Sequence, residues 1–163
     1  MKKDVTQTHL LGRSLVDKDS DIVWAVGSVD EANAFIGLAK VYVKDEKIKE
    51  TLSFIQRKMF KAGMEIVSKE SVFSDEDFNE IMGIIKEFEK EVVKPRKFII
   101  LEKDEATAYL SVARAVVRRA ERWGVRLHKK GLVPKPFVEW MNKLSYLIYL
   151  MILKESNGKF EEL

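Results

Sequence analysis

Cysteine is absent from this 163-residue chain, and glycine, proline and histidine are scarce, with eight, three and two copies. The absence of cysteine excludes disulfides, thiolate nucleophiles, iron–sulfur clusters and cysteine-ligated zinc. A chain of this length buries about 70% of the surface that its unfolded form exposes, so its core needs neither a disulfide nor a structural metal. We therefore expect a single domain that spans residues 1–163.

The chain also lacks an excess of one charge and a long hydrophobic run. It has 29 Lys and Arg against 26 Asp and Glu, a formal net charge of +3, far from the dense positive charge of a dedicated nucleic-acid binder. Phosphate-bearing small molecules remain compatible with this balance. The longest apolar run, Leu144–Leu153, is about half as long as a bilayer-crossing helix, and the first twelve residues do not resemble a secretory signal. The sequence predicts a cytoplasmic protein with neither a nucleic-acid partner nor a membrane partner.

Helical periodicity covers most of the chain. The five predicted helices begin near Ser28, Asp45, Ser74, Asp104 and Pro136. Ser28 and Glu31 fit a capping box, which leaves residues 1–27 as an N-terminal loop segment and residues 28–163 as the helical part. Gly63 is expected to mark a close contact between helices. Five helices joined by short loops predict an all-α, antiparallel five-helix bundle.

A bundle does not by itself fix a function, and the densest chemistry lies in the segment 114–122, R-A-V-V-R-R-A-E-R. Arg114 and Arg118 are one turn apart, and Glu121 follows within the next turn, so the three side chains are neighbours. Arginine forks bind phosphate oxygens in pairs and keep their charge, which suits a polyphosphate ligand. A solvated helix face with Arg–Glu pairs is the alternative. Because Arg114 and Glu121 border an apolar stripe, partners across a subunit interface are favoured.

Other candidates are weaker. His9 and His128 lack the carboxylate spacing of a di-iron bundle, so we expect two surface histidines and no metal site. The chain has neither a glycine-rich phosphate loop nor a dinucleotide fingerprint. Core packing is the default interpretation of Phe98, and Trp24 and Trp140 are expected in the core or at an interface.

Four segments together resemble a known family. Ala25–Gly37 is similar to A-x-G-T-x-D-E-L-N-x-x-I-G, and Phe54–Gln56 with Gly63 is similar to I-Q-x-x-L-F-x-x-G. Arg114–Arg122 matches R-A-x-x-R-R-A-E-R, and Asn142–Ser145 is similar to N-R-L-S. These patterns resemble the ATP:cob(I)alamin adenosyltransferases of the propanediol-utilisation type, which are five-helix bundles that assemble as homotrimers. The resemblance covers nearly the whole chain, and the arginine block is its most specific part.

Carried over position by position, the resemblance implies an ATP site at a subunit interface. The residues that it assigns to ATP are Thr8, Lys18, Arg118, Glu121, Arg122 and Asn142. Lys18 would touch the triphosphate, and Arg114 would pair with Asp30 of a neighbouring subunit in the catalytic set with Arg118. Phe98 falls where a family aromatic packs near the cobalamin and helps to displace its lower ligand.

The implied reaction is attack of the cob(I)alamin cobalt on the 5′ carbon of ATP, which yields adenosylcobalamin and triphosphate. The protein would hold the leaving triphosphate with cations and Mg²⁺ and exclude water from the corrinoid. Because the cobalt is the nucleophile, no protein nucleophile is needed. A corrinoid reductase is a further candidate partner.

The chain departs from the family pattern at the N-terminus, where T-G-D-x-G-x-T-S-L-L-G becomes K-K-D-V-T-Q-T-H-L-L-G. Lys3 and Thr6 replace the two early glycines, and their Cβ atoms restrict the approach of backbone amides to phosphates. The segment 101–104 replaces a P-G-G turn, Lys143 replaces an arginine, and Tyr146 replaces an aspartate. An alternative function therefore stays open: a catalytically degenerate relative that serves as a corrinoid- or nucleotide-binding trimer or as an interaction protein. The choice between complete cobalamin and a precursor corrinoid is also open.

Overall fold

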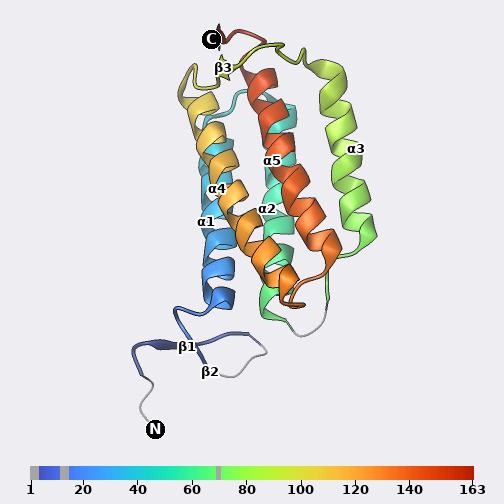
Figure 1. The fold of residues 1–163 in the computed structure, drawn as a ribbon. Helices are drawn as coiled ribbons and strands as arrows, with labels where there is room; N and C mark the ends of the chain where they lie inside the picture. Colours follow the sequence, from blue (N-terminus) through green and yellow to red (C-terminus); the bar gives the residue numbers. More distant parts are fainter. Residues whose placement is uncertain (1–3, 12–14, 69–70) are drawn as a thin grey trace.

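Five helices that run up and down side by side form the body of the protein (Figure 1). The computed structural model describes residues 4–11, 15–68 and 71–163. Its helices are α1 (Asp21–Tyr42), α2 (Glu46–Val67), α3 (Asp75–Glu91), α4 (Glu105–Lys129) and α5 (Lys135–Glu155). Helix α3 lies at the edge of the bundle and packs on α5, whereas α1 packs on α2 and α4. The prediction of an all-α five-helix bundle is confirmed.

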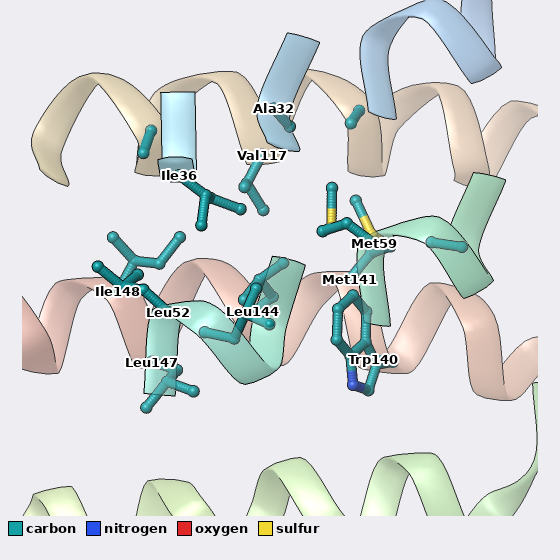
Figure 2. Packing of buried hydrophobic residues seen from close by; sticks show 14 of the residues in the cluster. Ala32, Ile36, Leu52, Met59, Val117, Trp140, Met141, Leu144, Leu147 and Ile148 are labelled. Carbon is teal, nitrogen blue, oxygen red and sulfur yellow. The ribbon is translucent and has the colours of Figure 1, made fainter. Parts of the chain in front are cut away.

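Helix α5 occupies the centre of the core because it contacts α2, α3 and α4. Figure 2 shows Met141, Leu144 and Ile148 of α5 facing Ile36 of α1 and Val117 of α4 across a shared apolar interior. The long apolar run of α5 is thus buried within the protein. Trp140 is only 1% exposed, as predicted for a core tryptophan.

Capping residues set most of the helix starts where the sequence predicts them. The Asp45 carboxylate accepts a hydrogen bond from the Ile48 N–H at 3.0 Å, and the Asp104 carboxylate accepts one from the Thr107 N–H at 2.9 Å. Ser74 caps α3 in a capping box. Such side-chain acceptors satisfy N–H groups that the first helical turn leaves without partners.

The predicted start of the first helix at Ser28 is wrong, and the boundary between residues 27 and 28 is wrong with it. Helix α1 begins at Asp21, and Ser28 is buried in its middle. Ala25 lies one turn before Val29 and extends the apolar stripe upstream. Asp21 suits the positive end of the helix dipole and forms ion pairs with Arg126 and with the α4 C-cap residue Lys130. The apolar stripe and these ion pairs outweigh the local capping signal.

The close helix contact expected at Gly63 is also absent, because a Cβ atom at that position would meet nothing within 4 Å among the described residues. Gly124 and Gly37 make the tight contacts instead. A Cβ on Gly124 would lie 2.8 Å from the Phe137 ring, and one on Gly37 would lie 2.7 Å from the Gln56 amide.

Short strands lie at the two ends of the bundle (Figure 1). Strands β1 (Gln7–His9) and β2 (Leu15–Asp17) form an antiparallel pair before α1. At the opposite end, β3 (Ile99–Ile100) pairs with β4 (Glu161–Glu162), and the Leu163 N–H donates to the Phe98 carbonyl at 2.9 Å. The segments before α1 and before α4 therefore lie at opposite ends of the bundle.

Candidate functional site

An open pocket of about 390 Å³ lies between α4 and α5. Its lining residues are Arg114, Arg118, Asn142, Lys143, Ser145, Tyr146 and Tyr149. Arg114 and Arg118 lie one turn apart on α4, and Asn142 and Lys143 lie on α5. Three of these seven side chains are cations and none is a carboxylate, so the pocket suits an anionic ligand.

Glu121 and Asn142, both predicted for the site, are brought together at the edge of this pocket. The Asn142 amide donates to the Glu121 carboxylate at 2.8 Å, which links α4 to α5. The hydrogen bond orients the Asn142 amide at the pocket that Arg118 also lines.

The arginines of the block divide into two roles. Arg119 forms an ion pair with Glu31 of α1 and serves the packing of α4 on α1. Arg118 and Arg122 are exposed, and neither forms an ion pair with another side chain of the described chain. The Nε atom of Arg114 is buried without a hydrogen-bond partner among the described residues. A solvated face of Arg–Glu pairs explains Arg119 alone, and the other three arginines remain available to a ligand or to a second subunit.

Tyr146 forms a fixed side of the pocket. Its hydroxyl donates to the Glu89 carboxylate of α3 at 2.6 Å, and Lys94 forms an ion pair with the same carboxylate at 2.6 Å. Burial, together with the hydrogen bond to Glu89, raises the pKa of Tyr146, while Lys94 and then Tyr146 lower the pKa of Glu89. Near neutral pH the phenol is therefore a neutral donor and Glu89 an ionised acceptor. The Tyr149 ring stacks on the Tyr146 ring, with 6.4 Å between the two ring centroids.

Asp30 lies on a different surface, at the rim of an apolar pocket between α1 and α2. This pocket also measures about 390 Å³ and is lined by Asp30, Asn33, Met59 and Phe60, among others. The side-chain oxygen of Asn33 is buried without a partner in the described structure, and Asp30 is exposed. Within the chain, Asp30 and Arg114 line different pockets.

Thr8 and Lys18 lie in the hairpin segment at one end of the bundle. The Lys18 N–H donates to the Thr6 carbonyl at 2.8 Å, and the Thr6 N–H donates to the Asp4 carboxylate at 3.0 Å. These bonds lock Thr6, where the family pattern has a glycine, into a turn. The substitution at Lys3 and the retained Gly12 lie outside the described residues.

The aromatic predictions have mixed outcomes. Core packing of Phe98 is wrong: the side chain is 87% exposed, because β3 and β4 pair at the rim of the bundle and leave the ring in solvent. Trp24 is 56% exposed and stacks on Trp123 at 5.9 Å, so it does not belong to the core. His9 and His128 are surface residues, as predicted.

Sequence reasoning missed Ser145 and Tyr149 as pocket residues. Ser145 follows Asn142 by three positions and Tyr149 follows Ser145 by four, so the helical spacing alone could have placed all three on one face of the helix. The apolar run around them indicated burial instead and concealed this polar face.

Comparison with known proteins identifies the family. Residues 1–155 match the family model described as cobalamin adenosyltransferase. A corrinoid adenosyltransferase of Bacillus subtilis is 31% identical over 150 residues, which cover 87% of this chain and 77% of the relative. The corrinoid adenosyltransferase PduO of Salmonella typhimurium is 29% identical over 161 residues, 94% of this chain, which spans about half (48%) of that relative's length.

A solved structure has the same fold. A variant PduO-type ATP:corrinoid adenosyltransferase from Lactobacillus reuteri, complexed with cobalamin and ATP, superposes with a TM-score of 0.87 at 22% identity. The match covers 97% of this chain and 91% of that structure. With the five-helix bundle and the family model in agreement, the chain belongs to the cobalamin adenosyltransferase family.

Proposed function

We propose that the protein transfers the 5′-deoxyadenosyl group of ATP to the cobalt of a cob(I)alamin-type corrinoid. The observation that carries this proposal is the cationic pocket between α4 and α5, which gathers Arg118 and Asn142, with Glu121 hydrogen-bonded to Asn142. Membership of the family supports the same reaction class. Relatives bear the name corrinoid adenosyltransferase, and the Lactobacillus reuteri structure contains cobalamin and ATP.

In this reaction the protein positions charge and supplies no nucleophile. The substrate cobalt(I) attacks C5′ of ATP, the cobalt–carbon bond forms, and the C5′–oxygen bond breaks with its electron pair on the triphosphate. Cobalt(I) is formally oxidised to cobalt(III), and triphosphate leaves. The negative charge grows on the leaving oxygen, so Arg118 and Arg122 lower the barrier by binding it more strongly in the transition state.

ATP would arrive with Mg²⁺ on its phosphates. Within the described residues no three His, Cys, Asp or Glu side chains gather as a metal site, so phosphate oxygens would supply most of the ligands. The ion would neutralise charge on the triphosphate. Lys18 and Thr8 in the hairpin segment are the further phosphate contacts in this proposal, and the locked Thr6 turn is the feature that distinguishes this loop from the glycine pattern.

The complete site would form between subunits of a homotrimer. The β1–β2 hairpin, which Lys18 follows, and strand β3, which the exposed Phe98 precedes, lie at opposite ends of the bundle, so a single chain cannot place both residues at one ligand (Figure 1). Arg114 Nε is buried without a partner, and Asp30 is exposed on α1. A neighbouring subunit that placed its Asp30 against Arg114 would satisfy both groups.

The surface of α1 supports the same assembly. By length and composition α1 is apolar enough to cross a membrane, yet its Ala25 to Ala39 stripe packs inside the bundle. Its exposed apolar side chains are Trp24, Leu38, Val41 and Tyr42. An outer apolar face on a helix already packed in a core is typical of a subunit interface. The cytoplasmic location and the reductase partner expected from the sequence stay predictions.

The test is an anaerobic assay with purified protein, chemically reduced cob(I)alamin and MgATP, read as spectral conversion to the light-sensitive adenosyl form. We expect turnover above a protein-free control and a loss of about 100-fold or more in the Arg118→Ala variant. Arg126→Ala is the matched control, since Arg126 lies on the same helix but pairs with Asp21 outside the pocket. ATP binding by calorimetry without turnover would favour the degenerate relative. Equal activity of both variants would contradict the site assignment.

A further inference from the structure

One cation in the pocket has no task in the reaction proposed above. Arg118 and Asn142 are assigned to ATP, and Arg114 is assigned to Asp30 of a neighbour. Lys143 lines the same pocket and is half-buried. In residues 4–11, 15–68 and 71–163, its ammonium takes part in no hydrogen bond or ion pair, although it lies close enough to help lower the pKa of Glu89.

The carboxylates on the helices around Lys143 are already engaged. The engaged pairs are Glu89 with Lys94 at 2.6 Å, Glu139 with Lys135 at 2.8 Å and Glu121 with Asn142 at 2.8 Å. Glu139 precedes Lys143 by one turn and is the usual i,i+4 partner for a lysine, but its own partner is the lysine on the preceding turn. None of these three carboxylates forms an ion pair with the Lys143 ammonium, which leaves it available to an anion that enters the pocket.

The residue one turn after Lys143 adds no negative charge either. Tyr146 lines the pocket with a neutral phenol whose hydrogen is committed to Glu89 at 2.6 Å. An aspartate at this position, which the family pattern has, would neutralise a cation three residues earlier on the same helix. The Tyr146–Glu89–Lys94 contacts hold the phenol in place, so this side of the pocket remains cationic.

We propose that Lys143 is a specificity-determining residue that binds a free carboxylate on the periphery of the corrinoid. The protein then prefers a corrinoid with at least one peripheral carboxylate over one whose peripheral acids are all carboxamides. The ammonium–carboxylate hydrogen bond is charge-assisted, whereas a carboxamide offers only a neutral acceptor. This inference rests on the proposed function and adds the substrate class. The triphosphate of ATP is the other anion that Lys143 could meet, and the test separates the two.

The experiment compares two corrinoids at saturating MgATP: one fully amidated and its monocarboxylic acid derivative, both reduced to cobalt(I). The readout is the ratio of kcat/KM for the acid to that for the amide. We expect the wild-type ratio to be about ten and the ratio of Lys143→Gln to fall to about one. Tyr146→Asp should lower the ratio as well, because the new carboxylate would pair with Lys143.

Matched variants isolate the charge. Lys143→Arg keeps a cation in the pocket and should keep a ratio well above one. Lys90→Gln removes the same charge from an exposed site on α3, where Lys90 pairs with Glu87, and should keep the wild-type ratio. Circular dichroism and thermal unfolding of each variant exclude misfolding as the cause.

The same ratio is measured for binding, by calorimetry with both corrinoids in their stable oxidised forms and ATP present. Equal affinity and equal turnover for acid and amide would overturn the inference and leave the proposed function standing. A rise in the KM for ATP in Lys143→Gln with an unchanged corrinoid ratio would assign Lys143 to the triphosphate and also overturn it. Absence of all corrinoid binding and turnover in the wild type would refute both.

Discussion

Charge exchange between Asp30 and Arg114 tests the intersubunit site most directly. Arg114→Asp places a carboxylate where a partly buried guanidinium now has an unpartnered Nε, and Asp30→Arg places a cation on the exposed rim of α1. In a trimer each single variant sets two like charges against each other at every interface. Breaking a desolvated pair costs about 3 kcal/mol, and three symmetric interfaces multiply this to about 9 kcal/mol per trimer.

The assay is light scattering and sedimentation over a wide concentration range, with circular dichroism to show that each variant is folded. We expect a trimer for the wild type and monomers for both single variants at micromolar concentration. The double variant restores opposite charges and should recover most of the assembly and part of the turnover. Trimers of both single variants, or a double variant no better than the singles, would refute the pairing of Asp30 with Arg114.

Three further changes test the fold and the rim of the site. Asp77 is 2% exposed, and burial alone would raise its pKa. Ion pairs with two lysines of α2 outweigh burial and lower the pKa of Asp77. The ionised Asp77 therefore stabilises the fold above about pH 4, and this stabilisation is lost as the pH falls further. Asp77→Asn should cost about 2–4 kcal/mol in urea unfolding at pH 7 and much less at pH 2, and an equal cost at both would contradict the ion-pair explanation. Gly124→Ala should lower the free energy of unfolding by about 1–2 kcal/mol, because the new methyl group would press on the Phe137 ring. Gly83→Ala, on the open surface of α3, should raise the free energy of unfolding by about 0.5–1 kcal/mol. Equal effects of the two substitutions would exclude the steric explanation. Phe98→Ala should change thermal stability little, since the ring is exposed, but should reduce corrinoid turnover, and unchanged turnover would remove Phe98 from the site.

The parts of the fold that the sequence predicts well are those set by local chemistry. The predicted helix starts at Asp45, Ser74 and Asp104 coincide with capping residues, and each cap acts within the first turn of its own helix, independently of the rest of the chain. Trp140 was expected in the core or at an interface, and it lies in the core. The apolar run of α5 was predicted as a buried helix from its own residues, without knowledge of its partners.

The parts that failed depend on contacts between distant segments. Ser28 has the local chemistry of a helix cap, but Asp21 pairs with the end of α4 and moves the helix start upstream. Phe98 is apolar in an apolar segment, yet pairing of β3 with the C-terminal β4 fixes it at the rim. A Cβ on Gly63 would meet nothing within 4 Å in the described residues, whereas one on Gly124 would meet the Phe137 ring of α5. None of these partners is close in sequence to the residue that it controls.

The candidate site shows the same division. The spacing of Arg114 and Arg118 predicted that they share one face of one helix. The family resemblance added Asn142, and the structure places this α5 residue in the same pocket as the two arginines. Spacing could not distinguish the role of Arg119 from that of the other arginines, since only the packed structure reveals its ion pair with Glu31.

Two buried polar atoms of this chain lie beside its pockets without partners among the described residues. A buried polar atom without a partner costs free energy, so natural folds keep few of them and keep them where something else arrives. In the described chain such atoms include Arg114 Nε beside the cationic pocket and Asn33 Oδ1 beside the apolar pocket that Asp30 borders. One of these surfaces is cationic, and the other is apolar with the acidic Asp30 at its rim, so the proposed trimer would bring opposite charges together. In the proposed trimer, a second copy that placed α1 against the α4–α5 pocket would supply partners to both surfaces and enclose the nucleotide and the corrinoid between them.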